Sequence, residues 1–483
     1  MKTRVLLCCL ALAGCAVGPD YQAPSVPSAA GTGAAGLAMA LDPQAVRNEP
    51  APDRWWSLYH DPVLERLVAD ALAHNPDLRT AAANLTRARA ALSERRADRL
   101  PSTQTSVAAT RERLAAGQGR AGPEEISLYR AGFDVAYEAD LFGGVSRAIE
   151  AARADADAAK AELDAARVSI AAETANAYAA ACGAGFRAKV AAETVALQTR
   201  TLDLMRTLDT AGRSGRRDVD RADVLLAQSQ AVVPTIEAER RSALFALATL
   251  TGRPPQDIDG EAQACIEPLF LDAPLPVGDS AGLLARRPDV RAAERRLHAQ
   301  TARIGVATAA LYPSVVFGGS VSSSGRGSGE LLKSPGLAFS VGPLVSWNFP
   351  NQAAARAQVR QASAGADAAL AQFDGVVLNA LRETEDALSR YVALRERAGL
   401  LRRAEESSTR AAELSRMRFS SGADGALPLL EAERDRVQAR AALAQVVQDL
   451  SEAEIGVFKS LGGGWREAPE PRRLAAQAAG AEH

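Results

Sequence analysis

Hydrophobic and polar positions alternate in four short segments of the chain. In residues 129–138 the odd positions are Tyr, Ala, Phe, Val and Tyr, and the even positions are Arg, Gly, Asp, Ala and Glu. Successive residues of a strand point to opposite faces, so this pattern predicts a β-strand with one apolar and one polar face. Segments 313–323 and 335–347 repeat the pattern, with bulky apolar residues opposite serine and glycine, and segment 102–112 repeats it more weakly.

These four predicted strands have the length of membrane strands. Each spans about 10 to 13 residues, close to the roughly 9–11 that cross a bilayer at a tilt. A soluble sheet packed on a core would alternate in the same way. The turn-rich segments 114–128 and 324–334 and the scarcity of other strand candidates favour the membrane. Four strands cannot close a barrel, and an open edge in lipid leaves backbone groups unpaired. We therefore expect several copies of the chain to pool their strands; three copies would supply twelve, although two or four would also satisfy the argument.

The segments between the strand pairs predict very long helices. Residues 144–211 contain no proline, and residues 352–421 form a second copy of this stretch. At 1.5 Å per residue, each helix would measure roughly 100 Å. Glycine-containing turns follow at 211–215 and 421–425, where glycine fits the left-handed cap that ends a helix.

Shorter helices complete each half. Return helices are predicted over 217–251 and 426–461. Asp61 followed by Pro62 is typical of a helix start, and one helix is expected from there to about Leu100.

The same elements occur twice, offset by about 210 residues, and such self-similarity sets the architecture. Asn75-Pro76-Asp77 matches Arg287-Pro288-Asp289, and the proline after each of these helices, Pro101 and Pro313, matches as well. The predicted organisation is a signal peptide over 1–14, an N-terminal segment over 15–60, a first repeat over 61–252 with a β-hairpin at 102–138, a linker over 253–282, a second repeat over 283–462 with a β-hairpin at 313–347, and a tail over 463–483.

The N-terminus predicts export and lipidation. A basic start, residues 1–4, precedes an apolar run over 5–13 that is too short to cross a bilayer, as in a signal peptide. Leu12-Ala13-Gly14-Cys15 resembles the lipobox of bacterial lipoproteins, in which Cys15 would carry lipid and become the mature N-terminus. An ordinary signal peptide with a chance cysteine is the alternative. By the same resemblance, Ala16 in the next position favours sorting to the outer membrane.

Composition argues against several classes of function. A net charge of −2 argues against nucleic acid binding. Four histidines without metal-ligand spacing argue against a metal site, and no phosphate-binding loop or nucleophile-elbow motif occurs. We therefore expect no enzyme activity and no cofactor apart from the lipid on Cys15.

Two cysteines, Cys182 and Cys265, remain in the mature chain as ordinary thiols. One disulfide between them is possible in an oxidising periplasm. Cys182 lies in the middle of a predicted alanine-rich helix, however, and this position favours a small buried residue.

The chain resembles outer-membrane efflux lipoproteins of the TolC-like family, the NodT type that is partnered with RND pumps. The order and spacing of the matching stretches make the resemblance specific, and they cover nearly the whole mature chain. These stretches are 15–21 (CAVGPDY), 55–64 (WWSLYHDPVL), 75–79 (NPDLR), 286–297 (RRPDVRAAERRL), 304–314 (IGVATAALYPS) and 460–465 (SLGGGW).

The resemblance implies a mixed α and β membrane protein with an internal two-fold repeat. A homotrimer would form a 12-stranded outer-membrane β-barrel, four strands per chain, continued by a periplasmic α-helical barrel of roughly 100 Å. The N-terminal segment, the proline-rich linker and the tail would form an equatorial belt.

The implied function is a passive exit duct for small molecules or drugs. Such a duct is the outer-membrane channel of a tripartite efflux system, driven by an inner-membrane RND-type pump through a periplasmic adaptor. Two other functions stay open: a type I protein-secretion channel with the same fold, and a periplasmic scaffold without a pore.

Control of such a duct is expected at the hairpin tips, where charges gather. By resemblance to the family's second tip, Asp424 would contribute to an acidic ring that narrows the aperture, and Arg418 to a latch between helices. Pro428 departs from the family's pattern, and a merely solvated tip is the alternative. In the first repeat the aperture candidates are Asp218, Arg216 and Arg217, and adaptor contacts would centre on the turn glycines. These glycines are Gly212, Gly215, Gly422 and Gly425.

Overall fold

A computed structural model describes residues 16–24, 45–114, 124–271, 273–331 and 336–470. Cys15 lies outside the described residues, so its lipidation stays a prediction. The chain divides into two compact units, and each takes segments from both repeats. The strand unit comprises Met1–Ser25, Asn84–Lys160 and Ala292–Asp374; the helical unit comprises Val26–Ala83, Ala161–Arg291 and Gly375–His483.

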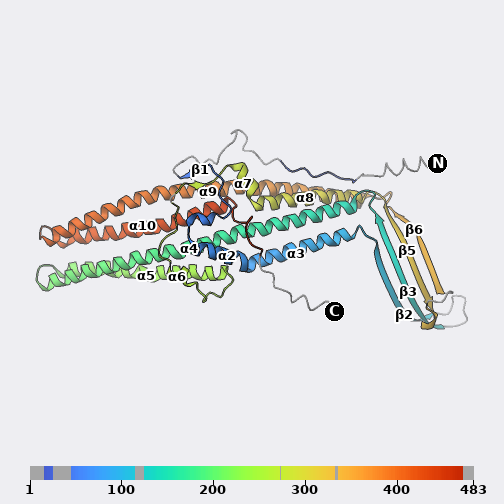
Figure 1. The fold of residues 1–483 in the computed structure, drawn as a ribbon, viewed down its shortest axis with the longest axis horizontal. Helices are drawn as coiled ribbons and strands as arrows, with labels where there is room; N and C mark the ends of the chain where they lie inside the picture. Colours follow the sequence, from blue (N-terminus) through green and yellow to red (C-terminus); the bar gives the residue numbers. More distant parts are fainter. Residues whose placement is uncertain (1–15, 25–44, 115–123, 272, 332–335, 471–483) are drawn as a thin grey trace. The chain divides into compact units, whose positions relative to one another are not determined.

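The strand unit contains a four-stranded antiparallel sheet in the order β2-β3-β5-β6 (Figure 1). The strands are β2 (Ser102–Leu114), β3 (Glu124–Ala139), β5 (Ser314–Gly325) and β6 (Leu337–Ser346), which confirms the four predicted strands. Strand β3 begins five residues before its predicted start at Tyr129, so the prediction of a turn over 124–128 was wrong. A short 3-10 helix, η2 (Ser328–Glu330), follows β5. Among the described residues, β2 and β6 each pair on one side only, so the sheet has two open edges.

The register of the sheet gathers the predicted apolar positions on one face. Directly paired residues share a face. Phe133 pairs with Val321, which pairs with Phe339, so the three lie in one row across the sheet. Tyr137 and Phe317 form part of another row. This face is uncovered in the single chain: Phe339 is 81% exposed and Phe133 is 45% exposed.

Helices of both repeats meet within the strand unit. Leu92 of α3 (Pro76–Ala97) packs with Ile149 and Ala156 of α4 (Gly144–Thr210). Arg303 of α8 (Pro288–Ala309) donates a hydrogen bond of 2.6 Å to Asp155 of α4. An apolar contact and a charged contact therefore hold these helices together.

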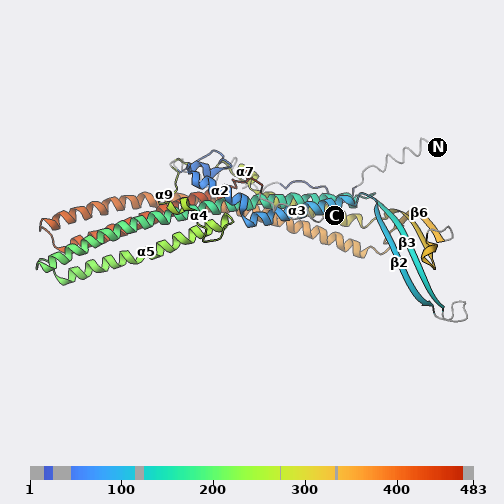
Figure 2. The ribbon, with the colours of Figure 1, turned by 60° about the horizontal axis from the view of Figure 1, so that its bottom comes forward.

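Two helical hairpins form most of the helical unit (Figures 1 and 2). The first joins α4, of 67 residues, to α5 (Arg216–Leu250), and the second joins α9 (Ala353–Ser420), of 68 residues, to α10 (Ala426–Ser460). The predicted long helices and return helices are thus confirmed. No helix in the described part of the chain combines the length and the apolarity needed to cross a membrane.

The single helix predicted from Asp61 to Leu100 was wrong, because the chain breaks at Asn75. Helix α2 (Pro62–His74) ends there and α3 begins at Pro76. Proline has no N–H to continue the ladder and disfavours a helical residue before it. Asn75 is accordingly extended, with ψ 131°, and its Oδ1 accepts hydrogen bonds from the amides of Asp77 (2.8 Å) and Leu78 (3.2 Å). In the second repeat, α7 (Ser280–Arg286) and α8 break in the same way before Pro288.

The N-terminal segment, the linker and the tail contact one another in the helical unit. Strand β1 (Val46–Arg47) pairs in parallel with β4 (Leu275–Pro276) of the linker. In the tail, the Gly464 amide donates to Asp53 Oδ1 of the N-terminal segment at 3.3 Å. Trp55 of the 3-10 helix η1 (Trp55–Tyr59) also stacks on Phe458 of α10 at 5.0 Å.

The linker is also bonded covalently to α4. It contains the short helix α6 (Gly260–Ala264), and the next residue, Cys265, forms a disulfide with Cys182. The interpretation of Cys182 as an unpaired small residue was therefore wrong, although the residue is buried as expected. Gly185 shows why the partners meet: a Cβ there would lie 2.5 Å from the carbonyl oxygen of Cys265, so glycine lets the linker approach the helix.

Candidate functional site: the hairpin tips

The two hairpin turns share one backbone conformation. Gly212 and Gly422 have positive φ angles of 67° and 74°. Gly212 N–H donates to Asp209 O at 2.9 Å, and the next amide, that of Arg213, reaches back to Leu208 O at 2.8 Å. These two bonds define a Schellman cap, and equivalent bonds form around Gly422. Gly215 and Gly425 then cap the starts of α5 and α10 with extended backbone.

Two ion pairs, one exposed and one partly exposed, follow the first turn. Arg216 lies 3.4 Å from Asp220, and Arg221 lies 3.7 Å from Asp218. Ser214 Oγ donates to Asp218 Oδ2 at 3.3 Å. The two candidates Arg216 and Asp218 are therefore placed on the first turns of α5, each paired within its own helix. Arg217 lies beside them and is exposed.

The second turn brings Arg418 and Asp424 together. Arg418 Nε donates to Asp424 Oδ2 at 2.6 Å, and Nη2 donates to Oδ1 at 2.9 Å. This bidentate geometry is the strong form of a charge-assisted hydrogen bond. Hydrogen bonding to Arg418 lowers the pKa of Asp424, and the same bonds raise the pKa of Arg418. The pair joins the end of α9 to its own turn, and its role at an aperture stays a prediction.

An apolar cluster connects the two hairpins just below their tips. Leu202 and Met205 of α4 and Val219 of α5 are buried together with Leu429 and Leu430 of α10. Phe419, one residue after Arg418, packs against the same cluster. The charged turns therefore rest on a shared hydrophobic base.

A buried carboxylate in the second hairpin, that of Glu433, is not among the residues predicted from the sequence. Glu433 is 0% exposed and accepts hydrogen bonds from Arg416 of α9 and, at 2.5 Å, from Arg436 of α10. Burial lowers the pKa of Arg436, and Glu433 opposes that effect. The signal was available: Glu433 lies three and four residues after Leu430 and Leu429, on the face that helical periodicity turns inward.

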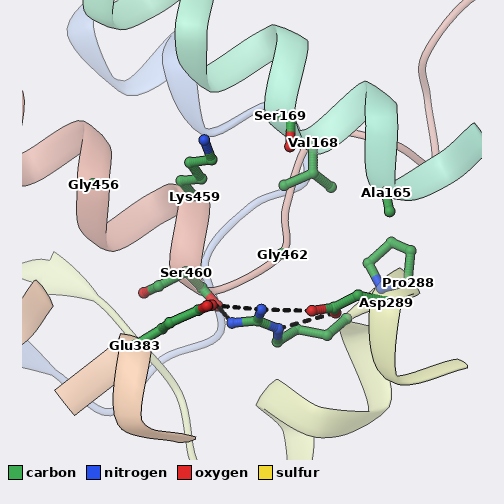
Figure 3. A pocket seen from close by; sticks show the side chains of 11 residues that line it. Ala165, Val168, Ser169, Pro288, Asp289, Glu383, Gly456, Lys459, Ser460 and Gly462 are labelled. Atoms are coloured by element: carbon green, nitrogen blue, oxygen red, sulfur yellow. Dashed lines mark hydrogen bonds and ion pairs between the residues drawn. The ribbon is translucent and has the colours of Figure 1, made fainter. Parts of the chain in front are cut away.

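A second polar cluster lies in the helical unit, where the second repeat breaks before Pro288. Arg287 is buried and donates to Asp289 (2.6 Å) on α8, to Glu383 (2.8 Å) on α9 and to the carbonyl of Ser460 (3.0 Å) at the end of α10. Figure 3 shows Asp289 and Glu383 directed toward one another across this cluster. Burial opposes the charge of Arg287, but its hydrogen bonds to the two carboxylates outweigh burial and raise its pKa.

The pocket beside Arg287 has a volume of about 390 Å³ and is lined by α4, α8, α9 and α10. The Arg287 guanidinium already donates its hydrogen bonds to Asp289, Glu383 and Ser460. The cluster therefore acts as a structural junction. Across the described ranges, no group of three or more His, Cys, Asp or Glu side chains is arranged to hold a metal ion.

Comparison with known proteins matches both repeats to one family. The family described as outer membrane efflux protein matches residues 67–253 and 281–463. The outer membrane protein OprJ of Pseudomonas aeruginosa is 32% identical over 472 residues, covering 96% of this chain and 95% of OprJ. Nodulation protein T of Rhizobium leguminosarum bv. trifolii is 29% identical over 458 residues, covering 94% and 96% of the two chains.

Solved channel structures share the fold. The structure of the outer-membrane channel OprN superposes with a TM-score of 0.86 at 37% identity, covering 93% of this chain and 100% of that one. The open state of the MtrE outer membrane channel of Neisseria gonorrhoeae gives a TM-score of 0.80 at 28% identity, covering 95% and 99%. The predicted fold class, membrane strands joined to long periplasmic helices, is confirmed.

Proposed function

The chain belongs to the outer membrane efflux protein family and is an outer-membrane channel component of an efflux system; from this premise, we propose that three copies form its passive exit duct. The supporting observation is the four-stranded sheet, which exposes an apolar face and leaves two edges open. In lipid, the backbone groups at a sheet edge need hydrogen-bond partners from protein, so strands from other copies would complete a barrel.

The opposite face of the sheet suits a water-filled lumen. Ser320 and Ser340 are hydrogen bonded at 2.9 Å across β5 and β6, and Ser314 and Ser346 at 2.6 Å. Arg130 and Asp134 lie on the same face of β3, opposite in direction to Phe133. A polar lining would let hydrated molecules pass without any bond-making step, so we assign the chain no catalytic residue.

The partners follow from the same role. A duct without an energy source needs an inner-membrane pump, for which we propose an RND type, and a periplasmic adaptor that docks on the glycine turns of the tips. We propose lipid on Cys15 as an additional anchor in the outer membrane. Relatives described as components of antibiotic and toluene efflux pumps support small molecules as the cargo.

At the tips, we propose that Asp424 and Arg418 control the aperture. In the single chain their charges neutralise each other within one turn. Opening would require this pair, repeated in each copy, to exchange partners with a neighbouring chain or with the adaptor.

Conductance in planar bilayers tests the proposed duct. The purified full-length protein is expected to give discrete single-channel steps and to migrate as a heat-modifiable trimer. Deletion of its gene is expected to raise susceptibility to small toxic compounds. Loss of one secreted protein with unchanged susceptibility would indicate the secretion channel instead, and absence of conductance from stable trimers would indicate a scaffold.

A further inference from the structure

The residues that directly follow Cys15 are docked on the strand unit. The stretch Ala16–Tyr21, called the arm below, belongs to one of the most distinctive motifs of the chain, yet neither the pore nor the tips use it. Its contacts involve α4 of the first repeat and α8 of the second, and all of them lie within the strand unit.

Backbone contacts fix the first residues of the arm. Val17 N–H donates to the carbonyl of Phe142 at 3.1 Å, and Val17 O accepts from Arg147 Nε at 3.4 Å. Gly143 has φ 79°, and a Cβ on it would lie 2.7 Å from the Cα of Ala16. The arm therefore begins against the loop between the end of β3, at Ala139, and the start of α4.

A contact between two glycines follows. Gly18 has φ 92°, and a Cβ on it would lie 2.5 Å from the Cα of Gly305 on α8. A Cβ on Gly305 would in turn lie 2.7 Å from Cγ of Arg147. No side chain fits between the arm and α8 at this point, so the approach depends on glycine at both positions.

Polar and aromatic contacts hold the end of the arm. Asp20 accepts a 2.6 Å hydrogen bond from Arg147, whose side chain is 8% exposed and which also donates to Glu150 at 2.8 Å. Tyr21 stacks on His298 of α8, with ring centroids 4.1 Å apart and planes 10° apart. Its hydroxyl donates to Glu294, and burial together with Glu294 raises the pKa of Tyr21, so the donor stays protonated.

We propose that this surface of α4 and α8 is a docking site for the mature N-terminal arm, and that docking clasps the two repeats together beside the sheet. The proposal adds to the proposed lipidation of Cys15. Consecutive Cα atoms are about 3.8 Å apart, so an acyl anchor on Cys15 would be tethered one residue from the Ala16–Gly143 contact, next to the strands. The contacts themselves, and not the lipid, hold the arm.

Hydrogen–deuterium exchange on the full-length protein tests the docking. Exchange is followed in peptides of the arm, whose Val17 amide donates to Phe142 O and is expected to be protected in the wild type. Gly18→Ala should accelerate their exchange at least about tenfold because the added methyl overlaps Gly305, and Asp20→Asn should accelerate it less. Gln22→Ala, at the exposed position directly after the arm, is the matched control and should leave the exchange unchanged. An arm in Gly18→Ala that is as protected as in the wild type would overturn the proposal.

Peptides from β3 and β5 report whether the sheet itself is intact. Their exchange rates should be the same in all variants. If Gly18→Ala accelerates exchange in these strands, the milder Asp20→Asn becomes the test. Arm exchange in Asp20→Asn equal to that of the wild type would then contradict the docking.

A non-lipidated form separates the contacts from the anchor. Replacing the signal peptide with an ordinary one and introducing Cys15→Ser should leave the arm as protected as before. Loss of protection in this form would show that the lipid holds the arm, which contradicts the proposal. Conductance of the same preparation tests the channel independently: a protected arm without conductance would count against the proposed function alone.

Discussion

The two hairpins place the same pair of charges at matching positions but in different surroundings. Arg206 and Asp223 in the first repeat correspond to Arg416 and Glu433 in the second. Asp223 is 62% exposed and lies 3.9 Å from Arg206, whereas Glu433 is fully buried and is bound by Arg416 and additionally by Arg436. Exposed pairs contribute little to stability, whereas a buried charge depends strongly on its partners. The two hairpins therefore share a fold, but at these matching positions the second has a buried polar network and the first has an exposed pair.

The residues before the two equivalent prolines differ in a similar way: the first repeat has a neutral side chain and the second a buried charged one. Asn75 joins its helices with a neutral side chain: Nδ2 donates to the carbonyl of Leu250 at 3.0 Å while Oδ1 caps α3. Arg287 makes the equivalent bond to Ser460, also at 3.0 Å, and adds two carboxylates. A charged side chain thus ties together more elements than the amide does.

The largest expected effect is at Glu433. Glu433→Ala leaves Arg436 buried without its counter-charge, so the free energy of unfolding should fall by about 3–5 kcal/mol. Asp223→Ala, the matched change in the first repeat, should cost less than about 1 kcal/mol because the pair is exposed. Thermal unfolding of the two variants measures both, and equal shifts would contradict the comparison.

The disulfide is the next largest difference, because the position that matches Cys182 in the second repeat is Val392. Cys182→Ser with Cys265→Ser should lower the free energy of unfolding by about 2–4 kcal/mol, since the unfolded chain loses a crosslink. Wild-type protein unfolded with and without a reductant provides the control. If a reductant still lowers the free energy of unfolding of the double variant, the decrease does not come from this disulfide.

A pH dependence distinguishes the repeats as well, because Glu454 takes the place of the buried Leu244. Burial raises the pKa of Glu454 to about 8, while the Leu271 amide and the Tyr59 hydroxyl, 3.4 Å away, oppose the shift. The folded state keeps the proton where the unfolded state has lost it, so stability should fall as the pH rises from about 4.5 to about 8, by roughly 2–4 kcal/mol. Glu454→Gln should remove this slope, and Glu413→Gln, at an exposed position, should retain it. An identical slope in Glu454→Gln would refute the assignment.

The junctions should show a smaller contrast. Arg287→Ala removes bonds to three helices and is expected to cost about 2–3 kcal/mol, and Asn75→Ala, which removes a cap and one bond, about 1–2 kcal/mol. Exposed Arg79→Ala is the control. A larger decrease in the denaturant midpoint for Asn75→Ala than for Arg287→Ala would contradict the interpretation of the charged junction.

The smallest effect on stability, and the most direct on function, is expected at Asp424. Its counterpart in the first tip is Ser214, so Asp424→Ser makes the two turns alike and removes the partner of Arg418. Single-channel conductance should rise or its cation preference should weaken, with little change in unfolding temperature because the pair is exposed. If the conductance and the ion preference of this variant both equal those of the wild type, Asp424 does not control the aperture.

Much of the fold could be predicted because its signals are local. The alternation around Phe133 and Phe339 predicted strands and faces, and the proline-free stretch from Gly144 predicted the length of α4. The break at Asn75 was present in the sequence as Asn-Pro, but the single helix predicted from Asp61 to Leu100 ran through it. Among site residues, Asp424 and Arg418 were predicted on one tip, but their pairing with each other required the turn geometry.

The sequence by itself determined the strand faces, the lengths of the two long helices and the glycine turns, because each depends on neighbours within a few residues. The repeat was visible because the same series of local signals occurs twice. Only the tertiary structure decided that Cys182 meets Cys265, that Glu433 is buried while Asp223 is not, and that Gly18 packs on Gly305. Those outcomes depend on which distant segments approach one another. A local pattern shows which side of a helix is turned inward, and the packing of other elements determines what that side meets.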